Sequence, residues 1–310
     1  MARIGLVLHP TRDVTAAVSQ VADWARDGAA ELVAATGDAR RAGVDGVVPV
    51  PEEVLADTCD GIIAMGGDGT ILGAMRLVSA RPVPVLGVNL GHLGFLAEVE
   101  ARELRTALTA MAEGRVTTES RGCLVVRHRD WEWLAFNDAV LARVPGEGMV
   151  SATLSVGGQP YGHLRCDAVI VATAMGSTAY NYAAGGPVVS PGIEGVLVTP
   201  AAPMSGISRS VLLAPSEPLR LTISAGNPAM EFDGVLGGRL QPGDEVEVTY
   251  RARAGQLVRI EGSRSAARSR VKLSLVDLPY LPGELLELLP AEQRARLAAA
   301  PDGADTDDAG

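Results

Sequence analysis

Lysine is almost missing from this chain of 310 residues. The chain has 27 basic residues, and Lys272 is the only lysine among them. A Walker-type phosphate-binding loop requires Gly-Lys followed by Ser or Thr. The sequence contains no such tripeptide. This absence excludes a P-loop NTPase.

Cysteine and long apolar runs are scarce as well. Cys59, Cys123 and Cys166 lie far apart and form no CxxC pair. This excludes a disulfide framework and a zinc site, and indicates a reducing compartment. No apolar run reaches the roughly 18 residues of a membrane-spanning helix, and the run that follows Met1 is too short for the core of a signal peptide. We therefore expect a cytoplasmic protein with no membrane partner.

Positive charge is in deficit, because the formal net charge is −10. An extended basic face for nucleic acid is therefore not expected. A small anionic ligand is still compatible with this charge, since a few backbone N–H groups and one arginine can hold a phosphate. With 47% hydrophobic and 21% charged residues, the composition is that of a globular protein. The length is sufficient for two domains.

The first part of the chain alternates apolar strands with helices. Continuous apolar strands of this kind indicate a parallel sheet that is covered on both faces. We predict an α/β N-terminal domain with a parallel Rossmann-like sheet over residues 1–114. Strands are predicted at 3–8, 31–35, 46–50, 61–65 and 83–88, and helices at 13–26 and from Thr70 to before Pro82.

The predicted secondary structure changes near residue 115, where short strands replace the alternation of strands and helices. We predict a β-rich C-terminal domain over 115–265, with Gly157-Gly158 as a two-residue hairpin turn. Residues 266–300 form a C-terminal segment that is expected to pack back on the N-terminal domain, and 301–310 an acidic tail that is expected to be disordered. Predicted strands lie at 123–127, 134–142, 152–156, 161–165, 168–172, 219–224, 229–232, 245–250, 257–260 and 271–275, with a helix at 282–300.

The segment GGDGT at 66–70 lies between a predicted buried strand and a predicted helix. Glycines let the backbone approach a ligand closely, and a helix start attracts phosphate. A carboxylate beside phosphate is unfavourable unless it holds a metal ion or takes a proton, which makes Asp68 the unusual member of this segment. Two alternatives remain open. Asp68 and Thr70 could cap the helix, or Gly67 to Gly73 could form a relaxed dinucleotide fingerprint.

Two further loops belong to the predicted site. Residues 89–96 follow the strand at 83–88, and loops after neighbouring parallel strands lie side by side at the carboxyl edge of a sheet. Residues 173–180 follow the strand at 168–172 and are expected to open a helix that could bind phosphate or ribose hydroxyls. Together the loops predict a nucleotide held between two domains.

These motifs resemble those of the bacterial NAD kinase family. GGDGT alone is not specific, because diacylglycerol kinases and phosphofructokinases carry similar loops. GSTAY with AGGP downstream is much more specific, and the motifs follow the family's order over most of residues 1–240. They are GGDGT at 66–70, NLGHLGFL at 89–96, Asn137-Asp138 within FNDAVLAR, RCDAVIVATAMGSTAYNYAAGGP at 165–187 and, more weakly, EFDG at 231–234.

The resemblance implies transfer of the γ-phosphoryl group of ATP, or of polyphosphate, to the 2′-hydroxyl of the adenosine ribose of NAD, which gives NADP. It implies that Asp68 is the general base, which could also organise Mg²⁺, and that Mg²⁺ or another divalent cation accompanies ATP; no residue is assigned as a dedicated metal ligand. It also implies a homodimer or homotetramer in which residues 165–167 reach a neighbour's site. The nucleotide-binding residues that it implies are Asp68, Gly69, Phe95, Asn137, Asp138, Arg165, Asp167, Thr178, Ala179, Tyr180 and Ala183.

Several positions depart from the family pattern. Asp138 stands where Glu is usual, Ala168 where Gly is usual, Ala174-Met175 where Pro-Thr is usual and Val235 where Gln is common. These departures leave the acceptor open between NAD, NADH and another nucleotide. The alternatives are a kinase of the GGDGT superfamily that acts on a lipid or sugar, and a catalytically weak NAD(P)-binding sensor.

Overall fold

The computed structural model describes residues 2–28, 30–90, 95–190 and 192–260, which belong to one compact unit, Met1–Ser263. The predicted strand at 271–275, the helix at 282–300, the segment 266–300 and the tail at 301–310 lie outside the described residues. Among the described helices, none combines the length and the apolar character needed to cross a membrane.

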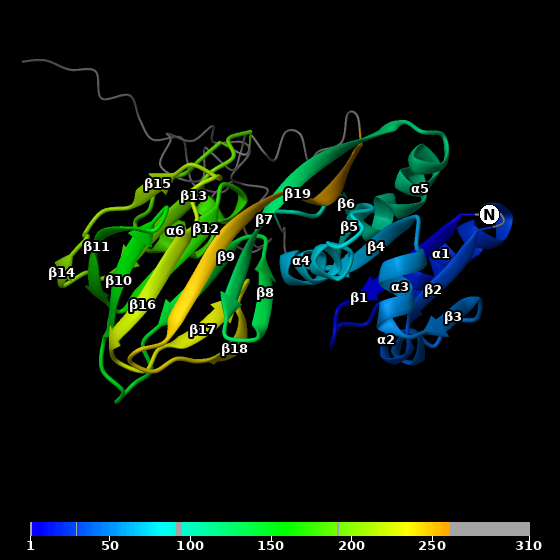
Figure 1. Ribbon diagram of the computed structural model, residues 1–310. Coiled ribbons are helices and arrows are strands. Elements are labelled where there is room, and N and C mark those ends of the chain that lie inside the picture. The colour runs from blue at the N-terminus through cyan, green and yellow to red at the C-terminus, as the bar shows by residue number, and fades with distance from the viewer. Residues whose placement is uncertain (1, 29, 91–94, 191, 261–310) are drawn as a thin grey trace, which may run out of the picture. The chain divides into compact units, whose positions relative to one another are not determined.

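Five parallel strands form one part of the largest sheet, in the order β5-β4-β1-β2-β3. Helices follow the strands along the chain (Figure 1). The predicted parallel Rossmann-like sheet with helices is therefore confirmed. Its elements are β1 (Arg3–Leu8), α1 (Thr15–Gly28), β2 (Glu31–Ala35), α2 (Thr36–Ala42), β3 (Val47–Val50), α3 (Glu52–Thr58), β4 (Gly61–Gly66), α4 (Asp68–Leu77), β5 (Pro84–Asn89), β6 (Val99–Glu100), η1 (Ala101–Glu103) and α5 (Leu104–Ala112).

Both faces of the parallel sheet are buried, because successive side chains of a strand point to opposite faces. On β4, Ile63 and Met65 pack in the core that contains residues of α1 and α5. Ile62 and Ala64 of the same strand pack in the core that contains residues of α3 and α4. A continuous apolar run without alternation is the sequence that such a strand requires.

The second part of the described chain is β-rich, as predicted. Its strands pair almost entirely antiparallel, and Gly157 and Gly158 form the β10–β11 turn with φ of 58° and 80°. The elements are β7 (Val116–His128), β8 (Trp131–Ala135), β9 (Asp138–Ala142), β10 (Val150–Val156), β11 (Gln159–Cys166), β12 (Ala168–Thr173), η2 (Met175–Thr178), α6 (Tyr180–Ala183), β13 (Val196–Ala201), β14 (Ser205–Gly206), β15 (Val211–Leu213), β16 (Leu219–Ala225), β17 (Ala229–Phe232), β18 (Val235–Arg239) and β19 (Glu245–Ile260).

A six-stranded sheet, in the order β15-β13-β12-β9-β17-β18, carries apolar side chains on both faces. Val169 and Val171 of β12 pack in a core shared with β10, β16 and β19 of the larger sheet. Ile170 and Ala172 of β12 pack in a separate small core with Val189. Strand β12, which leads into the 173–180 loop, is thus fixed from both sides.

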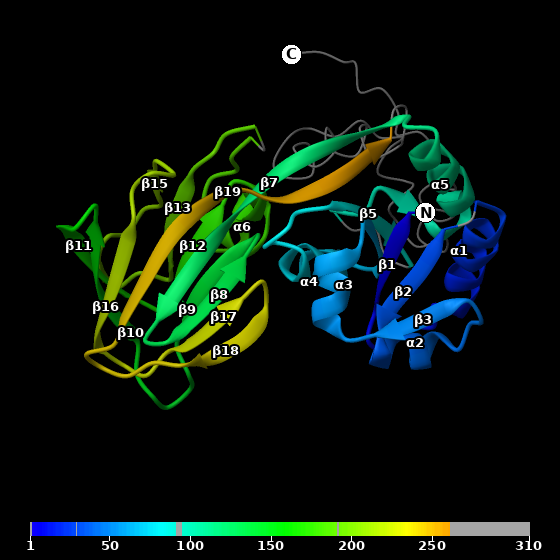
Figure 2. The same cartoon turned by 45° about the vertical axis from the view of Figure 1, so that its right-hand side comes forward.

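Two strand predictions are wrong. Residues 134–142 do not form one strand, because β8 ends at Ala135 in the larger sheet and β9 begins at Asp138 in the six-stranded sheet. Phe136 and Asn137 cross from one sheet to the other. Conversely, the predicted strands at 245–250 and 257–260 are both parts of β19, which runs beside β7 (Figure 2).

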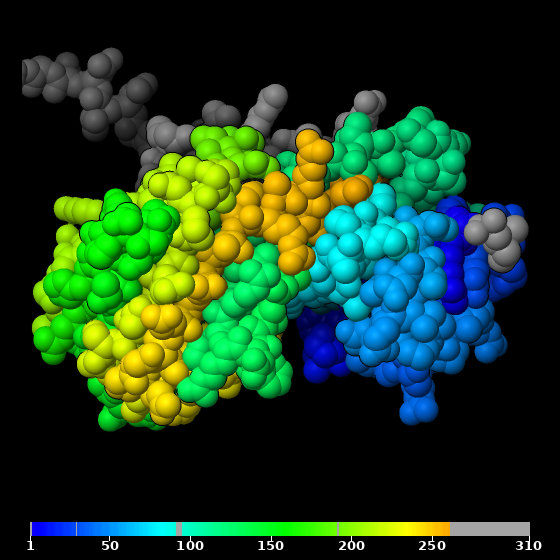
Figure 3. Space-filling model, viewed as in Figure 1, coloured from blue at the N-terminus to red at the C-terminus, as the bar shows by residue number. Residues whose placement is uncertain are grey.

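Strand β19 joins the antiparallel and parallel strands into one sheet. It pairs antiparallel with β16, and parallel with β5 through Gln256–Pro84 and Leu257–Val85. Between Arg251 and Gly255 the register of β19 against β7 shifts. A Cβ on Gly255 would come within 2.6 Å of Met75 Cε on α4. In Figure 3 the orange β19 lies against the cyan surface. A domain boundary at 114/115 stays a prediction.

Candidate functional site

The β4–α4 turn lies at the carboxyl edge of the parallel sheet, beside the point where the strand order reverses. Strand β1 pairs with β2 on one side and β4 on the other, and ligands of open α/β sheets bind beside such a point. A Cβ on Gly66 would lie 2.2 Å from Thr70 Oγ1, so only glycine fits there. The N-cap residue of α4 is Gly67, which has no side chain that could cap the helix. Asp68 and Thr70 lie in the first turn of α4, and the capping alternative for them stays a prediction.

Asp68, the first residue of α4, is held by the loop that follows β5. Its Oδ2 accepts the backbone N–H of Phe95 at 2.8 Å, and its Oδ1 accepts that of Leu96 at 2.9 Å. Hydrogen bonds to a charged acceptor are stronger than neutral ones. Both carboxylate oxygens are thus oriented, and each keeps lone-pair capacity. The loops at 66–70 and 95–96 meet as predicted, while residues 91–94 lie outside the described residues.

The other end of α4 is bound to the β17–β18 turn. Arg76 Nη1 lies 2.5 Å from Asp233 Oδ2. The Asp233 side chain is fully buried, and it also accepts the N–H groups of Phe136 at 3.1 Å and Asn137 at 2.7 Å. No role for Arg76 or Asp233 was predicted from the sequence. The only signal was the EFDG match at 231–234.

Asn137 lies where the chain crosses between the sheets. Thr173 donates its N–H to the Asn137 carbonyl at 2.9 Å and its hydroxyl to the Phe136 carbonyl at 2.6 Å. A Cβ on Gly176 would come within 2.0 Å of the Asn137 oxygen. The 173–180 loop therefore packs directly on the crossing.

Asp138 begins β9 with a side chain that is 5% exposed. Burial, helped by the charges of Asp233 and Glu231 and opposed by the hydrogen bond from the backbone N–H of Tyr180, raises the pKa of its carboxyl to about 7. The hydrogen bond from Tyr180 joins two residues that the family resemblance places at the nucleotide. Asp138 can therefore change its charge near neutral pH.

Residues 175–178 form the 3-10 turn η2, and residues 180–183 form the four-residue helix α6, where a helix start was predicted. A buried amide fixes this segment. Asn181 donates to the carbonyls of Ser177 at 2.9 Å and Pro187 at 3.0 Å, and accepts the Thr199 hydroxyl at 2.6 Å. Thr178, Ala179, Tyr180 and Ala183 are left partly or fully exposed, with Tyr180 at 42%.

Arg165 and Asp167 lie at the end of β11 and just after it. The backbone of Arg165 pairs with Ser205 of β14, and the residue is exposed. Asp167 forms an ion pair with Arg143 at 3.1 Å. Arg165 and Asp167 therefore contact residues outside the predicted set.

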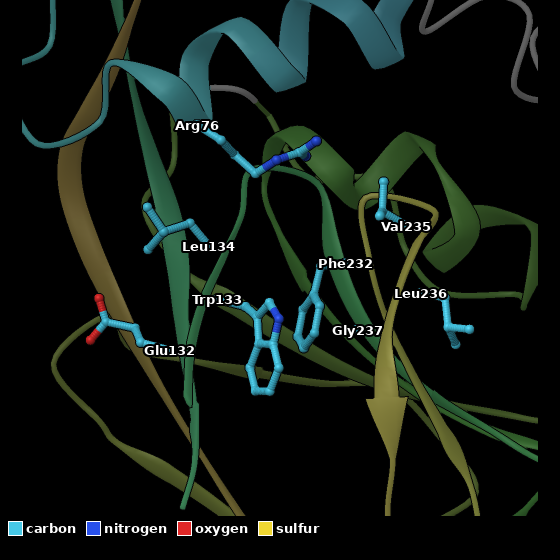
Figure 4. Close-up of a pocket in the computed structure, with 8 residues that line it drawn as sticks. All are labelled: Arg76, Glu132, Trp133, Leu134, Phe232, Val235, Leu236 and Gly237. Atoms are coloured by element: carbon cyan, nitrogen blue, oxygen red, sulfur yellow. The ribbon is translucent and has the colours of Figure 1, made fainter. Parts of the chain in front are cut away.

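Behind Arg76 lies a cavity of ≈ 280 Å³. Figure 4 shows the Arg76 guanidinium at one end and the rings of Trp133 and Phe232 below it. The two rings stack with centroids 5.0 Å apart. None of the predicted site residues lines this cavity; its lining is Arg76, Glu132, Trp133, Leu134, Phe232, Val235, Leu236 and Gly237.

No protein cage for a metal ion is present in the part of the chain that the structure describes, because no three His, Cys, Asp or Glu side chains group suitably there. Asp68 alone offers a carboxylate at the β4–α4 turn. Magnesium in phosphoryl-transfer sites is typically held by one or two carboxylates together with substrate phosphates. The residues fit a metal ion that arrives with its phosphates.

The chain matches two family models, the ATP-NAD kinase N-terminal domain over residues 4–116 and the ATP-NAD kinase C-terminal domain over residues 136–260. NAD kinase 1 of Streptomyces avermitilis is 36% identical over 268 residues, which cover 74% of this chain and 75% of that protein. NAD kinase 1 of Streptomyces coelicolor is 34% identical over 319 residues, which cover 89% of this chain and 87% of that protein.

Two solved structures share the fold. The crystal structure of yeast NADH kinase complexed with NADH has a TM-score of 0.80 at 22% identity, and covers 90% of this chain and 89% of its own. The structure of an NAD kinase from Archaeoglobus fulgidus in complex with ATP has a TM-score of 0.69 at 24% identity, and covers 89% of this chain and 100% of its own.

Proposed function

Because this chain belongs to the ATP-NAD kinase family, we propose that it transfers the γ-phosphoryl group of ATP to the 2′-hydroxyl of the adenosine ribose of NAD. The enzyme is a phosphotransferase that phosphorylates NAD with ATP to give NADP. The choice of hydroxyl and the roles of the residues below are the proposal.

The orientation of the Asp68 carboxylate supports its role as general base. Two backbone N–H groups fix its oxygens at the carboxyl edge of the sheet. The ribose oxygen attacks the γ-phosphorus, its proton passes to Asp68, and the bond from the γ-phosphorus to the bridging oxygen breaks to release ADP. Gly69, exposed in the first turn of α4, leaves the backbone open to the phosphates. A positioned base contributes about 10²–10⁴-fold to the rate of such a step.

The acceptor is proposed to lie along the second loop cluster. Asn137 and Asp138 would bind the ribose hydroxyls, and the exposed Thr178, Ala179, Tyr180 and Ala183 would bind the adenosine. Phe95 is 49% exposed beside Asp68, so its ring is available to stack on the acceptor. NADH in place of NAD, and polyphosphate in place of ATP, are tested in the same assay.

A divalent cation such as Mg²⁺ would be held by Asp68 and the phosphates of ATP, and would supply neutralisation of the phosphate charge. The protein's own part is to orient the Asp68 carboxylate. Both of its oxygens already accept one N–H, so coordination would use the remaining lone pairs.

We also propose that the enzyme works in the cytoplasm as a homodimer or homotetramer. The free thiols of Cys59, Cys123 and Cys166 are all buried, which suits a reducing compartment. Arg165 is exposed beside the two-residue strand β14, which suits contact of Arg165 and Asp167 with a neighbour's site. Light scattering with size-exclusion chromatography measures the oligomer.

The test of the base is Asp68→Asn, assayed with ATP, Mg²⁺ and either NAD or NADH. We expect kcat to fall about 10²–10⁴-fold, while calorimetry still detects NAD binding. A wild-type kcat in this variant would contradict the role of Asp68. A wild-type protein that binds NAD but makes no NADP would favour the sensor alternative.

A matched control separates loss of the base from loss of a structural hydrogen bond. Asp38 lies in the first turn of α2 and accepts the Leu8 N–H at 2.9 Å. Asp38→Asn weakens a comparable carboxylate bond at the same edge of the sheet. We expect it to lower the melting temperature and leave kcat unchanged.

A further inference from the structure

Helix α4 carries a charged residue at each end. Asp68 is its first residue, and Arg76 lies in its last turn. Eight residues of helix span about 12 Å, so a rigid rod of this length separates the proposed base from the guanidinium. Arg76 reaches the buried Asp233 carboxylate at 2.5 Å.

Asp233 collects several bonds on one carboxylate. Its Oδ1 accepts the N–H of Asn137 at 2.7 Å and that of Asp138 at 3.3 Å, and its Oδ2 accepts the N–H of Phe136 at 3.1 Å together with Arg76. These three consecutive N–H groups belong to the crossing between the sheets. The ion pair therefore links α4 to the backbone that carries the proposed acceptor residues.

A simpler explanation for Asp233 is turn geometry. Asp233 and Gly234 have φ of 48° and 77° and form the two-residue turn between β17 and β18. Asp-Gly and Asn-Gly both suit such a turn. The turn alone therefore requires no negative charge, and an asparagine at 233 would serve it equally. The full burial of the carboxylate against Arg76 is what the turn does not explain.

Asp233 also acts electrostatically on the acceptor side. Its charge is one of the causes that raise the pKa of Asp138. Arg76 is the cation paired with Asp233, and its side chain is 26% exposed. The arginine is thus bound to the carboxylate that both holds the crossing and raises the pKa of Asp138.

We infer that Arg76 and Asp233 are positioning residues, whose ion pair holds Asn137 and Asp138 at a fixed place relative to Asp68. The inference rests on the proposed function, because it assigns the acceptor to Asn137 and Asp138 and the proton to Asp68. The pair keeps the acceptor ribose aligned with the base. A misplacement of about 1 Å can lower a rate by about 10²-fold.

The test uses Arg76→Met, Asp233→Asn, the double variant and Arg76→Lys. For each single charge removal we expect kcat with NAD to fall 10- to 100-fold and the KM for NAD to rise, with the KM for ATP within threefold of wild type. The double variant should be no worse than either single variant, since residues that act as a pair are not additive. Arg76→Lys keeps the charge and should recover part of kcat.

The control is a second Arg–Asp pair in a β turn. Asp244 is 10% exposed, accepts the Gln241 N–H at 2.9 Å and pairs with Arg129 at 2.8 Å. Arg129→Met removes this pair at the turn before β19. We expect it to lower the melting temperature without changing kcat at 25 °C.

The outcomes separate this inference from the proposed function. Wild-type kcat and KM values in Arg76→Met and Asp233→Asn, or losses that add in the double variant, would overturn the inference alone. A wild-type protein that makes no NADP would overturn the proposed function, and the NAD dissociation constants of the same variants would then decide the role of the pair. NAD dissociation constants that equal the wild-type value in these variants would overturn the inference about the pair. If circular dichroism shows Arg76→Met to be unfolded, Asp233→Asn carries the test, and a wild-type kcat and KM for NAD in Asp233→Asn would overturn the inference.

Discussion

The surroundings of the Asp138 carboxyl group favour its neutral, protonated form. Burial and the negative charges of Asp233 and Glu231 raise its pKa from 3.8 to about 7. In the unfolded chain the carboxyl has the ordinary aspartate pKa of about 3.9. The raised pKa means that ionisation opposes folding as the pH rises from about 4 to 7. Above this pH range the ionisation of Asp138 destabilises the folded state by its full amount, and below this range it causes no destabilisation.

The pH dependence of NAD binding follows from this residue. If the ionised carboxylate is the form that accepts the ribose hydroxyls, lowering the pH from 8 to 6 should raise the KM for NAD about tenfold, because each pH unit below the pKa reduces the ionised fraction about tenfold. In Asp138→Asn the KM should be higher at pH 8 and independent of pH. Steady-state kinetics with saturating ATP measures this. A flat wild-type profile would contradict the assignment.

The residue scale also shows what a sequence can reveal about a site. Asp68 could be predicted because GGDGT places a carboxylate at a helix start. Its two hydrogen-bond donors lie 27 and 28 residues away, and Arg76 and Asp233 are 157 residues apart. Local patterns carry no information about such partners. The ion pair of Arg76 with Asp233, which links α4 to the crossing, therefore could not be predicted without the fold.

At the scale of elements, the apolar strands were the most predictable. Strands β1, β2 and β17 have the predicted ends. The break between β8 and β9 was missed because residues 134–142 are apolar apart from Asn137 and Asp138. Tertiary bonds from Asp233 and Thr173 end one strand and start the next. A helix start was predicted at α6 but not its length, because its anchor, Asn181, bonds to Thr199 in another strand.

The close contact between Gly176 and Asn137 gives a prediction for the loop as an element. In Gly176→Ala the new Cβ would lie 2.0 Å from a backbone oxygen, so either η2 or the crossing must move. We expect about 1–3 kcal/mol of destabilisation and at least a tenfold rise in the KM for NAD. Chemical denaturation and initial-rate kinetics measure the two effects.

Gly37→Ala is the control for that substitution. Gly37 lies in α2, and a Cβ there has no atom within 4 Å. The change should leave the KM for NAD unaltered and raise stability by up to about 1 kcal/mol. Equal KM values for Gly176→Ala and wild type would show that the loop does not position the acceptor.

At the scale of the whole molecule, the composition shift near residue 115 predicted two parts of different type. It could not show how they share a core. One buried cluster contains Ile71 and Met75 of α4, Cys123 of β7, Phe136 of the crossing and Leu257 of β19. This cluster and the continuous sheet combine residues from both sides of position 115.

A shared core predicts cooperative unfolding. Trp24 lies in α1, whereas Trp131 and Trp133 lie in β8. Fluorescence of Trp24→Phe and of the double variant Trp131→Phe/Trp133→Phe should therefore report coincident denaturation midpoints, equal to that from circular dichroism. Two separated transitions would instead favour independent domains on either side of residue 114.

The place of β19 in the sheet also sets an order for biosynthesis. Its pairing with β5 at Gln256 and Leu257 occupies an edge formed by residues translated about 170 positions earlier. As the ribosome extends the chain, the backbone polar groups of Pro84 and Val85 that face this edge, which include no N–H of Pro84, have no strand partner until β19 emerges. Nascent chains shorter than about 257 residues should therefore expose an incomplete parallel sheet, which is a surface that chaperones recognise and that other nascent strands can invade.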